Sequence, residues 1–246
     1  MIEFTLALAG RKIHVSAQTE TFLPFFRDYL TEGPADMEIV TTMDDIIYER
    51  NRSAREEYVE GKPVTVYPNG YLETLAIYRK IAEKMLDFDT LLFHGSAISV
   101  DGQGYLFTAK SGTGKSTHTA FWRETFGDRA VMVNDDKPLL RIMDDHVLVC
   151  GTPWNGKHRL GNDISVPLKG ICILSRAQDN QIRRIGAEEA LPMLIQQSHR
   201  PKDPAKLGKV LTLLEKLTQR TGLYALGCNL DPQAAMVAFN GMNGKE

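Results

Sequence analysis

The sequence has few cysteines, no long apolar run and no excess of charge of either sign. Three cysteines occur in 246 residues, far apart and without a Cys-x-x-Cys pair, which argues against a zinc site or a disulfide framework. No stretch approaches the roughly 18 consecutive apolar residues of a membrane span. The N-terminus lacks the basic and apolar regions of a signal peptide. We therefore expect a cytoplasmic protein.

The charge balance excludes some partners. The chain carries 29 Lys and Arg against 31 Asp and Glu, a formal net charge of −2, which gives no electrostatic reason to expect nucleic acid or an anionic membrane as a partner. The length, with 43% hydrophobic residues, suits one sizeable core or one domain with a smaller appendage.

Hydrophobic periodicity and turn residues divide the chain near residue 88. In an N-terminal α+β region, 1–88, we predict strands at 2–9, 12–16, 37–41 and 64–67 and helices at 21–30 and 72–86. The polar segment 44–60 has no clear pattern. In a mixed-sheet α/β domain, 89–246, we predict strands at 91–93, 96–100, 105–108, 130–133, 139–143, 146–150, 168–174, 181–185 and 223–226. Its predicted helices are 115–125, 187–197, 204–219 and one from 232. Hairpins at 96–108, 139–150 and 168–185 argue against an all-parallel sheet.

The strongest motif is the run Ala109-Lys110-Ser111-Gly112-Thr113-Gly114-Lys115-Ser116-Thr117. It follows a predicted strand and opens a predicted helix, which is the context that a phosphate-binding loop, or P-loop, requires. Ala109 stands where the pattern has its first glycine. We expect residues 111–117 to bind a nucleotide through backbone N–H groups and the positive end of the helix. We expect Lys115 to contact the β- and γ-phosphates and the Ser116 hydroxyl to bind Mg²⁺.

Two adjacent carboxylates, Asp135 and Asp136, end an apolar strand 20 residues after the P-loop lysine (135 − 115). Enzymes with P-loops often hold Mg²⁺ with a carboxylate in this position. With two carboxylates, one can bind metal while the other accepts a proton from an attacking hydroxyl. A second pair, Asp144 and Asp145, lies at a predicted hairpin tip and is typical of a solvated turn.

Further candidates flank these motifs. His94 precedes the hairpin that leads into the P-loop, so the chain returns it towards the phosphates, where it could contact a metal or a carboxylate. The glycine-rich loop 151–161 carries Lys157, His158 and Arg159. Such a loop could bind phosphate and offset transition-state charge; the alternative is an ordinary exposed loop.

In combination, these residues resemble the HPr kinase/phosphorylase family, whose fold is related to that of ATP-dependent phosphoenolpyruvate carboxykinase. The shared pattern is His94-Gly95, a hairpin, the P-loop and the Asp135-Asp136 pair, over roughly residues 91–174. The resemblance implies that Asp135 is a general base, that Asp136 lies on the metal side, and that His94 supports the base or contacts the metal. The N-terminal region and the loop 151–161 differ from that family. The chain looks more similar to shorter related enzymes that phosphorylate free serine or a peptide serine.

The sequence therefore predicts an ATP- and Mg²⁺-dependent phosphotransferase acting on a hydroxyl acceptor, with serine, free or in a peptide or protein, as the expected one. Arg159, Lys157 or His158 would offset charge during transfer. Two alternatives stay open: a donor such as ADP or pyrophosphate at the same site, and a nucleotide-binding or peptide-recognition module with little turnover. The family's frequent oligomers make a homo-oligomer compatible with this prediction.

Overall fold

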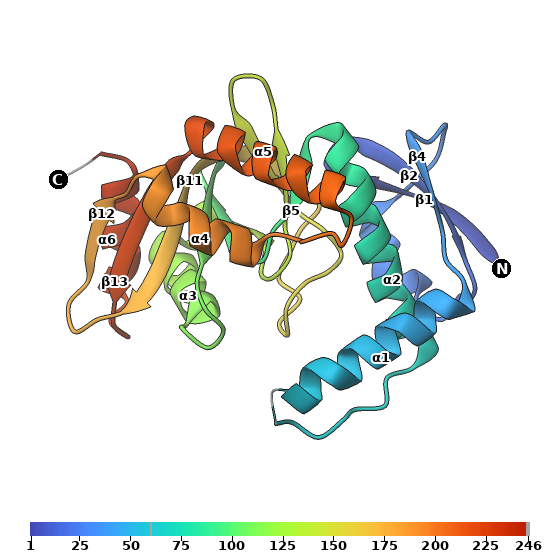
Figure 1. The fold of residues 1–246 in the computed structure, drawn as a ribbon. Coiled ribbons are helices and arrows are strands. Elements are labelled where there is room, and N and C mark those ends of the chain that lie inside the picture. The colour runs from blue at the N-terminus through green and yellow to red at the C-terminus, as the bar shows by residue number, and fades with distance from the viewer. Residues whose placement is uncertain (60, 245–246) are drawn as a thin grey trace. The chain divides into compact units, whose positions relative to one another are not determined.

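A computed structural model describes residues 1–59 and 61–244 of the chain (Figure 1). Its backbone contacts divide the chain into two compact units, Met1–Lys84 and Met85–Glu246. The sequence placed this division four residues later, between 88 and 89 (88 − 84). Among the described helices, none combines the length and the apolar character needed to cross a bilayer.

The first unit is an α+β unit built on a sheet with strand order β3-β1-β2-β4. Strands β1 and β2 form an antiparallel hairpin, and β4 runs parallel to β2. Alternate residues of the hairpin, among them Leu6, Ile13 and Val15, are fully buried, as expected for a sheet with one face against a core. The elements are β1 (Ile2–Leu8), β2 (Arg11–Ala17), the 3-10 helix η1 (Leu23–Tyr29), β3 (Leu30–Thr31), β4 (Met37–Val40), α1 (Met43–Val59) and α2 (Asn69–Lys84).

Helix α1 occupies most of the segment that the sequence left unassigned. Its buried residues are Ile46 and Glu49, so it has no apolar stripe to recognise. Ion pairs stabilise it instead: Arg79 of α2 contacts Asp45 at 3.1 Å and Glu49 at 2.6 Å. At its start, Asp45 Oδ2 accepts hydrogen bonds from the backbone and side chain of Thr42, which caps the first turn.

Two predictions for the first unit were wrong. Residues 64–67 form no strand; Val64 and Val66 are exposed there and have no sheet face to cover. The helix predicted at 21–30 is a short 3-10 helix followed by the two-residue strand β3. Pro24 lies in its first turn. Phe22, just before the helix, and Phe26 within it pack on Phe4 of β1 rather than along a helical stripe.

The second unit is a mixed α/β domain. Its sheet has the order β5-β9-β10-β11-β7-β6-β8, with β13 beside β11 and β12 beside β13. Parallel pairs, β11 with β7 and with β13, stand beside antiparallel hairpins, as the sequence predicted. The elements are η2 (Met85–Phe88), β5 (Thr90–Leu92), β6 (Ser96–Val100), β7 (Gln103–Thr108), α3 (Lys115–Phe126), η3 (Gly127–Arg129), β8 (Ala130–Asn134), β9 (Leu139–Ile142), β10 (Val147–Cys150), β11 (Ser165–Arg176), β12 (Gln181–Arg184), α4 (Ala187–Gln197), α5 (Pro204–Arg220), β13 (Gly222–Cys228) and α6 (Gln233–Met242).

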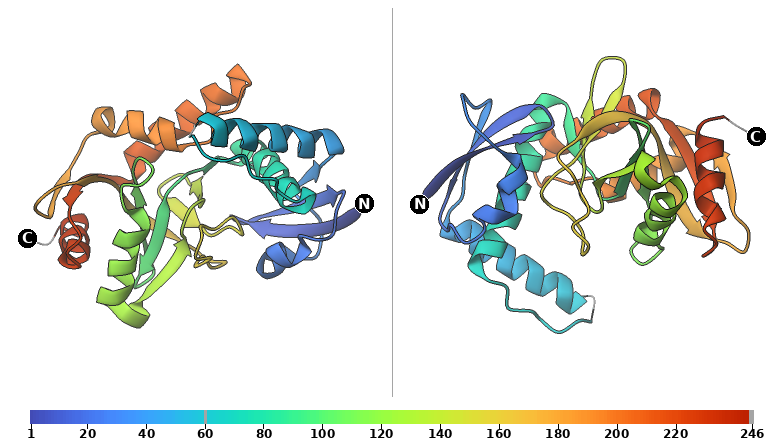
Figure 2. Two further views of the ribbon diagram at one scale, coloured as in Figure 1. Left: turned by 90° about the horizontal axis from the view of Figure 1, so that it is seen from below. Right: turned by 180° about the vertical axis from the view of Figure 1, so that it is seen from behind.

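Helices cover both faces of this sheet (Figure 2). Helices α4 and α5 bury a core that contains Ile171 and Leu223 of the central strands. On the opposite face, α3 and α6 pack around Trp122, which contacts the rings of Tyr105 and Phe107 from β7. The P-loop helix α3 is thus fixed to the strand that precedes the loop.

The hairpin predicted between 168–174 and 181–185 was wrong. Strand β11 pairs in parallel with β13, and β12 pairs antiparallel with the other side of β13. The buried run around Ile171 and Cys172 suits a central strand that has neighbours on both sides. The mostly exposed residues of β12 suit an edge strand. Pairing therefore follows burial rather than proximity in the sequence.

Candidate functional site

Sheet topology brings the predicted motifs to one edge. Strands β7 and β8 both pair antiparallel with β6, which lies between them. The carboxyl ends of β7 and β8 therefore emerge beside the start of β6. The P-loop follows β7, Asp135 and Asp136 follow β8, and His94 and Gly95 precede β6. Two hydrogen bonds connect these segments: Gly95 N donates to Asp136 O at 3.0 Å, and Thr108 Oγ1 donates to His94 O at 3.1 Å.

The P-loop has the backbone shape that its glycines permit. Gly112 and Gly114 have φ angles of +75° and +118°, a region that side chains rarely tolerate. A Cβ atom added to either glycine would meet nothing within 4 Å, so no other described part of the protein fills the space beside them. Helix α3 begins at Lys115, directly after Gly114, and its first N–H groups lie next to this space. Ser116 and Thr117 are exposed there.

Lys115 links the P-loop to the carboxylates electrostatically. Its Nζ donates to Ala109 O at 3.3 Å. Burial lowers the pKa of Lys115, and the negative charge of Asp136 acts against that shift. A partly desolvated ammonium group within range of this carboxylate is suited to bind phosphate oxygens. Lys115, predicted to contact phosphate, and Asp136, predicted to bind metal, therefore belong to one electrostatic cluster.

Asp136 contacts two side chains that favour its ionised form. His94 Nε2 lies 3.2 Å from its Oδ1, and Lys137 Nζ lies 2.6 Å from its Oδ2. Burial raises the pKa of Asp136, but the hydrogen bonds and charges of His94 and Lys137 outweigh that effect and lower it to about 2. A carboxylate this acidic is a poor base and remains ionised, as a metal ligand must.

Asp135 has a different environment. It is 9% exposed, and its Oδ1 accepts a hydrogen bond of 2.7 Å from Gly156 N in the loop 151–161. A Cβ atom on Gly156 would lie 3.0 Å from Asp135 Oδ2, so glycine allows the loop backbone to approach this closely. Two neighbouring carboxylates thus differ sharply: Asp136 contacts Lys137 and His94, and Asp135 contacts a neutral backbone amide.

The loop 151–161 is anchored at its base and exposed at its tip. Trp154 is buried, while Lys157, His158 and Arg159 are exposed. Arg159 N donates to Gly156 O at 3.2 Å, and Arg159 has a φ of +48°, which closes a tight turn next to Asp135. The structure therefore brings the loop backbone to the candidate site; the role of the Arg159 charge stays a prediction.

Asn134 organises this region and was not singled out from the sequence. It is fully buried. Its Oδ1 accepts hydrogen bonds from the backbones of Asp136 and Lys137, and its Nδ2 donates to Thr152 and to Trp154 O. One amide therefore positions both the Asp pair and the base of the loop. The available signal was a polar residue at the end of an apolar strand, immediately before two carboxylates.

The residues present fit a nucleotide and a magnesium ion. The open glycine loop and the partly buried Lys115 suit phosphate oxygens. The Ser116 hydroxyl and the ionised Asp136 provide the hard oxygen ligands that Mg²⁺ prefers. Within the described part of the chain, no group of three or more His, Cys, Asp and Glu side chains could hold a metal alone.

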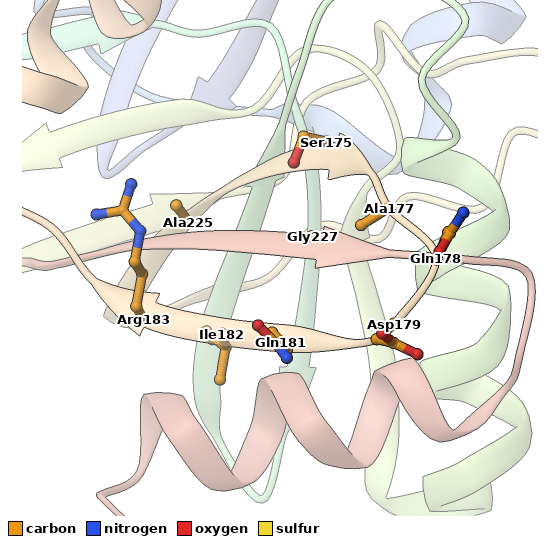
Figure 3. Close-up of a pocket in the computed structure, with 9 residues that line it drawn as sticks. All are labelled: Ser175, Ala177, Gln178, Asp179, Gln181, Ile182, Arg183, Ala225 and Gly227. Carbon is orange, nitrogen blue, oxygen red and sulfur yellow. The ribbon is translucent and has the colours of Figure 1, made fainter.

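Two cavities of similar volume border the ends of β11 and β13. One, of about 520 Å³, adjoins the P-loop. The other, of about 510 Å³, lies at the turn between β11 and β12 (Figure 3). Ser175, Ala225 and Arg183 lie on the side of the strands that faces away from α6 (Figure 3), and Arg183 is engaged by Glu189. This second cavity is lined by residues other than the predicted site residues.

No protein-family model matches the sequence, and no curated protein matches it. Among solved structures, the fold is similar to that of the Hpr(Ser) kinase/phosphatase from Coxiella burnetii, at 9% sequence identity and a TM-score of 0.37. The matched region covers 62% of this chain and 97% of that chain. Similarity at this level concerns the fold alone.

Proposed function

We propose that this chain is an ATP- and Mg²⁺-dependent phosphotransferase that moves a γ-phosphoryl group to a hydroxyl acceptor, a serine side chain. The main support is the common sheet edge that carries the P-loop, His94 and the Asp135-Asp136 pair, with Lys115 within electrostatic range of Asp136. The resemblance of these motifs to HPr kinases supports the same conclusion.

Each residue has a role that its surroundings suit. The P-loop amides and Lys115 bind the phosphates of the donor. Ser116 and Asp136 are the residues that would hold Mg²⁺, which supplies charge neutralisation on the β- and γ-phosphates. His94 and Lys137 keep Asp136 ionised. Arg159, with Lys157 and His158, lies on the loop that contacts Asp135 through Gly156 and offsets developing charge.

Asp135 is the base in this proposal because its carboxylate accepts a hydrogen bond from a backbone amide, whereas Asp136 forms an ion pair with Lys137. The acceptor oxygen forms a bond to the γ-phosphorus as the bond to the β,γ-bridging oxygen breaks, and ADP leaves. The acceptor proton passes to Asp135. The Gly156 N–H, 2.7 Å from Asp135 Oδ1, orients the carboxylate for that transfer.

The test is ATP turnover with Mg²⁺ in the presence and absence of acceptor pools: free serine and other hydroxyl metabolites, then serine peptides, then HPr. We expect one pool to stimulate ADP formation and to yield a phosphorylated product. Tight ATP binding without stimulation by any pool would contradict the proposal and favour a nucleotide-binding module. Turnover with ADP or pyrophosphate but not with ATP would show that the phosphoryl donor is one of these compounds instead of ATP.

A further inference from the structure

The cavity beside the P-loop has the size of a small-molecule site. Its volume of about 520 Å³ falls within the roughly 300–1,000 Å³ of known ligand pockets. Gly112 and Gly114 form one side, Thr117, His118 and Phe121 of α3 a second, and the ends of β11 and β13 a third. The cavity is therefore continuous with the loop that binds phosphate in the function proposed above.

The cavity lies beside the P-loop rather than at the carboxylates. Its described lining includes P-loop glycines but not His94, Asp135 or Asp136. A group bound there adjoins the phosphates without touching the residues proposed to react. This is the position of the part of a phosphoryl donor that does not take part in the chemistry.

The walls are mostly apolar. Phe121 and Leu230 line the cavity together with Ala177 and Cys228, and Leu230 is 80% exposed at its rim. Planar ring systems bind well between such side chains, because the contact removes apolar area from water on both partners. Arg176 at the same rim donates from Nη2 to Gly112 O at 2.7 Å, which places a cation where the cavity meets the loop.

One polar group on this wall has a defined hydrogen-bonding direction. Trp122 Nε1 lies 3.0 Å from His118 Nε2. An indole N–H can only donate, so His118 Nε2 must accept, and the ring proton of the neutral imidazole must be on Nδ1. His118 is 3% exposed and lines the cavity. Across residues 1–59 and 61–244, no group accepts a hydrogen bond from Nδ1.

We propose that this cavity binds the nucleoside of the phosphoryl donor, and that the Nδ1–H of His118 donates a hydrogen bond to an acceptor atom of that nucleoside. The inference rests on the proposed function, because it assumes that the P-loop holds the donor phosphates. It adds a residue that recognises the part of the donor that a P-loop does not read.

Two substitutions of His118 test the roles of its two ring nitrogens separately. In His118→Gln the side-chain amide reaches the Nε2 position, so it can still accept from Trp122 while the Nδ1 donor is lost. In His118→Asn the amide occupies the Nδ1 position, so the donor is kept and the partner of Trp122 is lost. The first variant tests recognition with the core contact preserved, and the second is its matched control.

The measurement is the affinity of each variant for Mg-ATP and for Mg-tripolyphosphate by titration calorimetry. We expect wild type to bind ATP more tightly than tripolyphosphate. His118→Gln should weaken ATP binding about 3- to 10-fold, as loss of one neutral hydrogen bond does, without changing tripolyphosphate binding. His118→Asn should keep the preference for ATP and unfold at a lower temperature.

Leu230→Ala provides a test that does not depend on the core, since this side chain is exposed. We expect it to weaken ATP binding about threefold by removing apolar contact area, again without effect on tripolyphosphate. The inference is overturned if both Leu230→Ala and His118→Gln keep the wild-type ratio of ATP affinity to tripolyphosphate affinity. Failure of wild type to bind either ligand would instead overturn the proposed P-loop function.

Discussion

The P-loop and the segment from Asn134 to Lys137 lie at the ends of β7 and β8, the two strands that flank β6 in one sheet, yet their backbones are held in different ways. The loop is open, and Gly112 and Gly114 have space around them. Asn134 is fully buried and forms hydrogen bonds with the backbones of Asp136 and Lys137 on one side and with Thr152 on the other. The loop thus has the shape of a site that a ligand completes, whereas the carboxylates are positioned by the protein itself. A site with both properties can bind a donor without first arranging its base.

The largest effect should be on the rate of transfer, when the buried carboxylate Asp135 is replaced. Asp135→Asn should lower the transfer rate about 10²- to 10⁴-fold, the usual contribution of a general base, while ATP affinity stays within about twofold. Transfer is measured as phosphorylated product, and binding by calorimetry. Asp144→Asn, at the tip of the β9–β10 hairpin, is the matched control and should leave both quantities unchanged. Loss of ATP binding in Asp135→Asn would make this residue a metal ligand instead.

Substitutions in the P-loop should change the affinity for ATP. Lys115→Ala should weaken ATP binding by about 10- to 100-fold, because a charge-assisted hydrogen bond to phosphate is lost. Lys110→Ala, in the same loop but upstream of the glycines, is a suitable control and should have a smaller effect. Calorimetry with Mg-ATP measures both. Unchanged affinity in Lys115→Ala would remove the P-loop assignment.

Replacing the buried Asn134 should lower the free energy of unfolding more than a substitution in the P-loop does. Asn134→Ala deprives the backbones of Asp136, Lys137 and Trp154 of their partner. We expect a loss of about 2–3 kcal/mol in the free energy of unfolding, since buried polar groups are left unsatisfied. Urea denaturation measures this. Gly114→Ala changes the open loop instead and should destabilise less. Equal stability of wild type and Asn134→Ala would contradict the assigned role.

The smallest predicted effect concerns pH. Burial against Phe107 and Trp122 lowers the pKa of His118 to about 4 from its ordinary value of 6.5. Between these values the unfolded chain binds a proton that the folded chain does not, so stability falls as the pH decreases through this window. His118 should account for a loss on the order of 2 kcal/mol between pH 7 and pH 5. Urea denaturation of the metal-free protein measures it. In His118→Gln this part of the slope should disappear; an unchanged slope would assign it to other groups.

Local features of the second unit could be predicted from the sequence. The strands around the P-loop, the start of α3 at Lys115 and the strand that ends at Asn134 are confirmed, because motif, turn chemistry and periodicity agree over short distances. The contrast between Asp135 and Asp136 could not be read in this way. It depends on Gly156, His94 and Lys137, and only the fold brings the first two of these to the carboxylates.

The errors have a common cause in contacts between distant residues. Helix α1 was missed because its stabilising contacts are ion pairs with Arg79, which is more than 25 residues away in the chain. Strand β12 was paired with β11, its neighbour in sequence, although β13 takes that position after two intervening helices. Hydrophobic patterns report which residues are buried, but not which partner buries them.

The contact between Gly156 and Asp135 has a kinetic consequence. A carboxylate that accepts its hydrogen bond from a loop backbone, and is only 9% exposed, has little contact with bulk water. Water is always the most abundant hydroxyl near a bound nucleotide. In the proposed enzyme, the base would be shielded from water while the loop is in place. An acceptor bound against Asp135, with the Gly156 hydrogen bond still in place, would exclude the remaining solvent. Idle hydrolysis of ATP would then remain slow, and transfer would be coupled to the arrival of the correct acceptor.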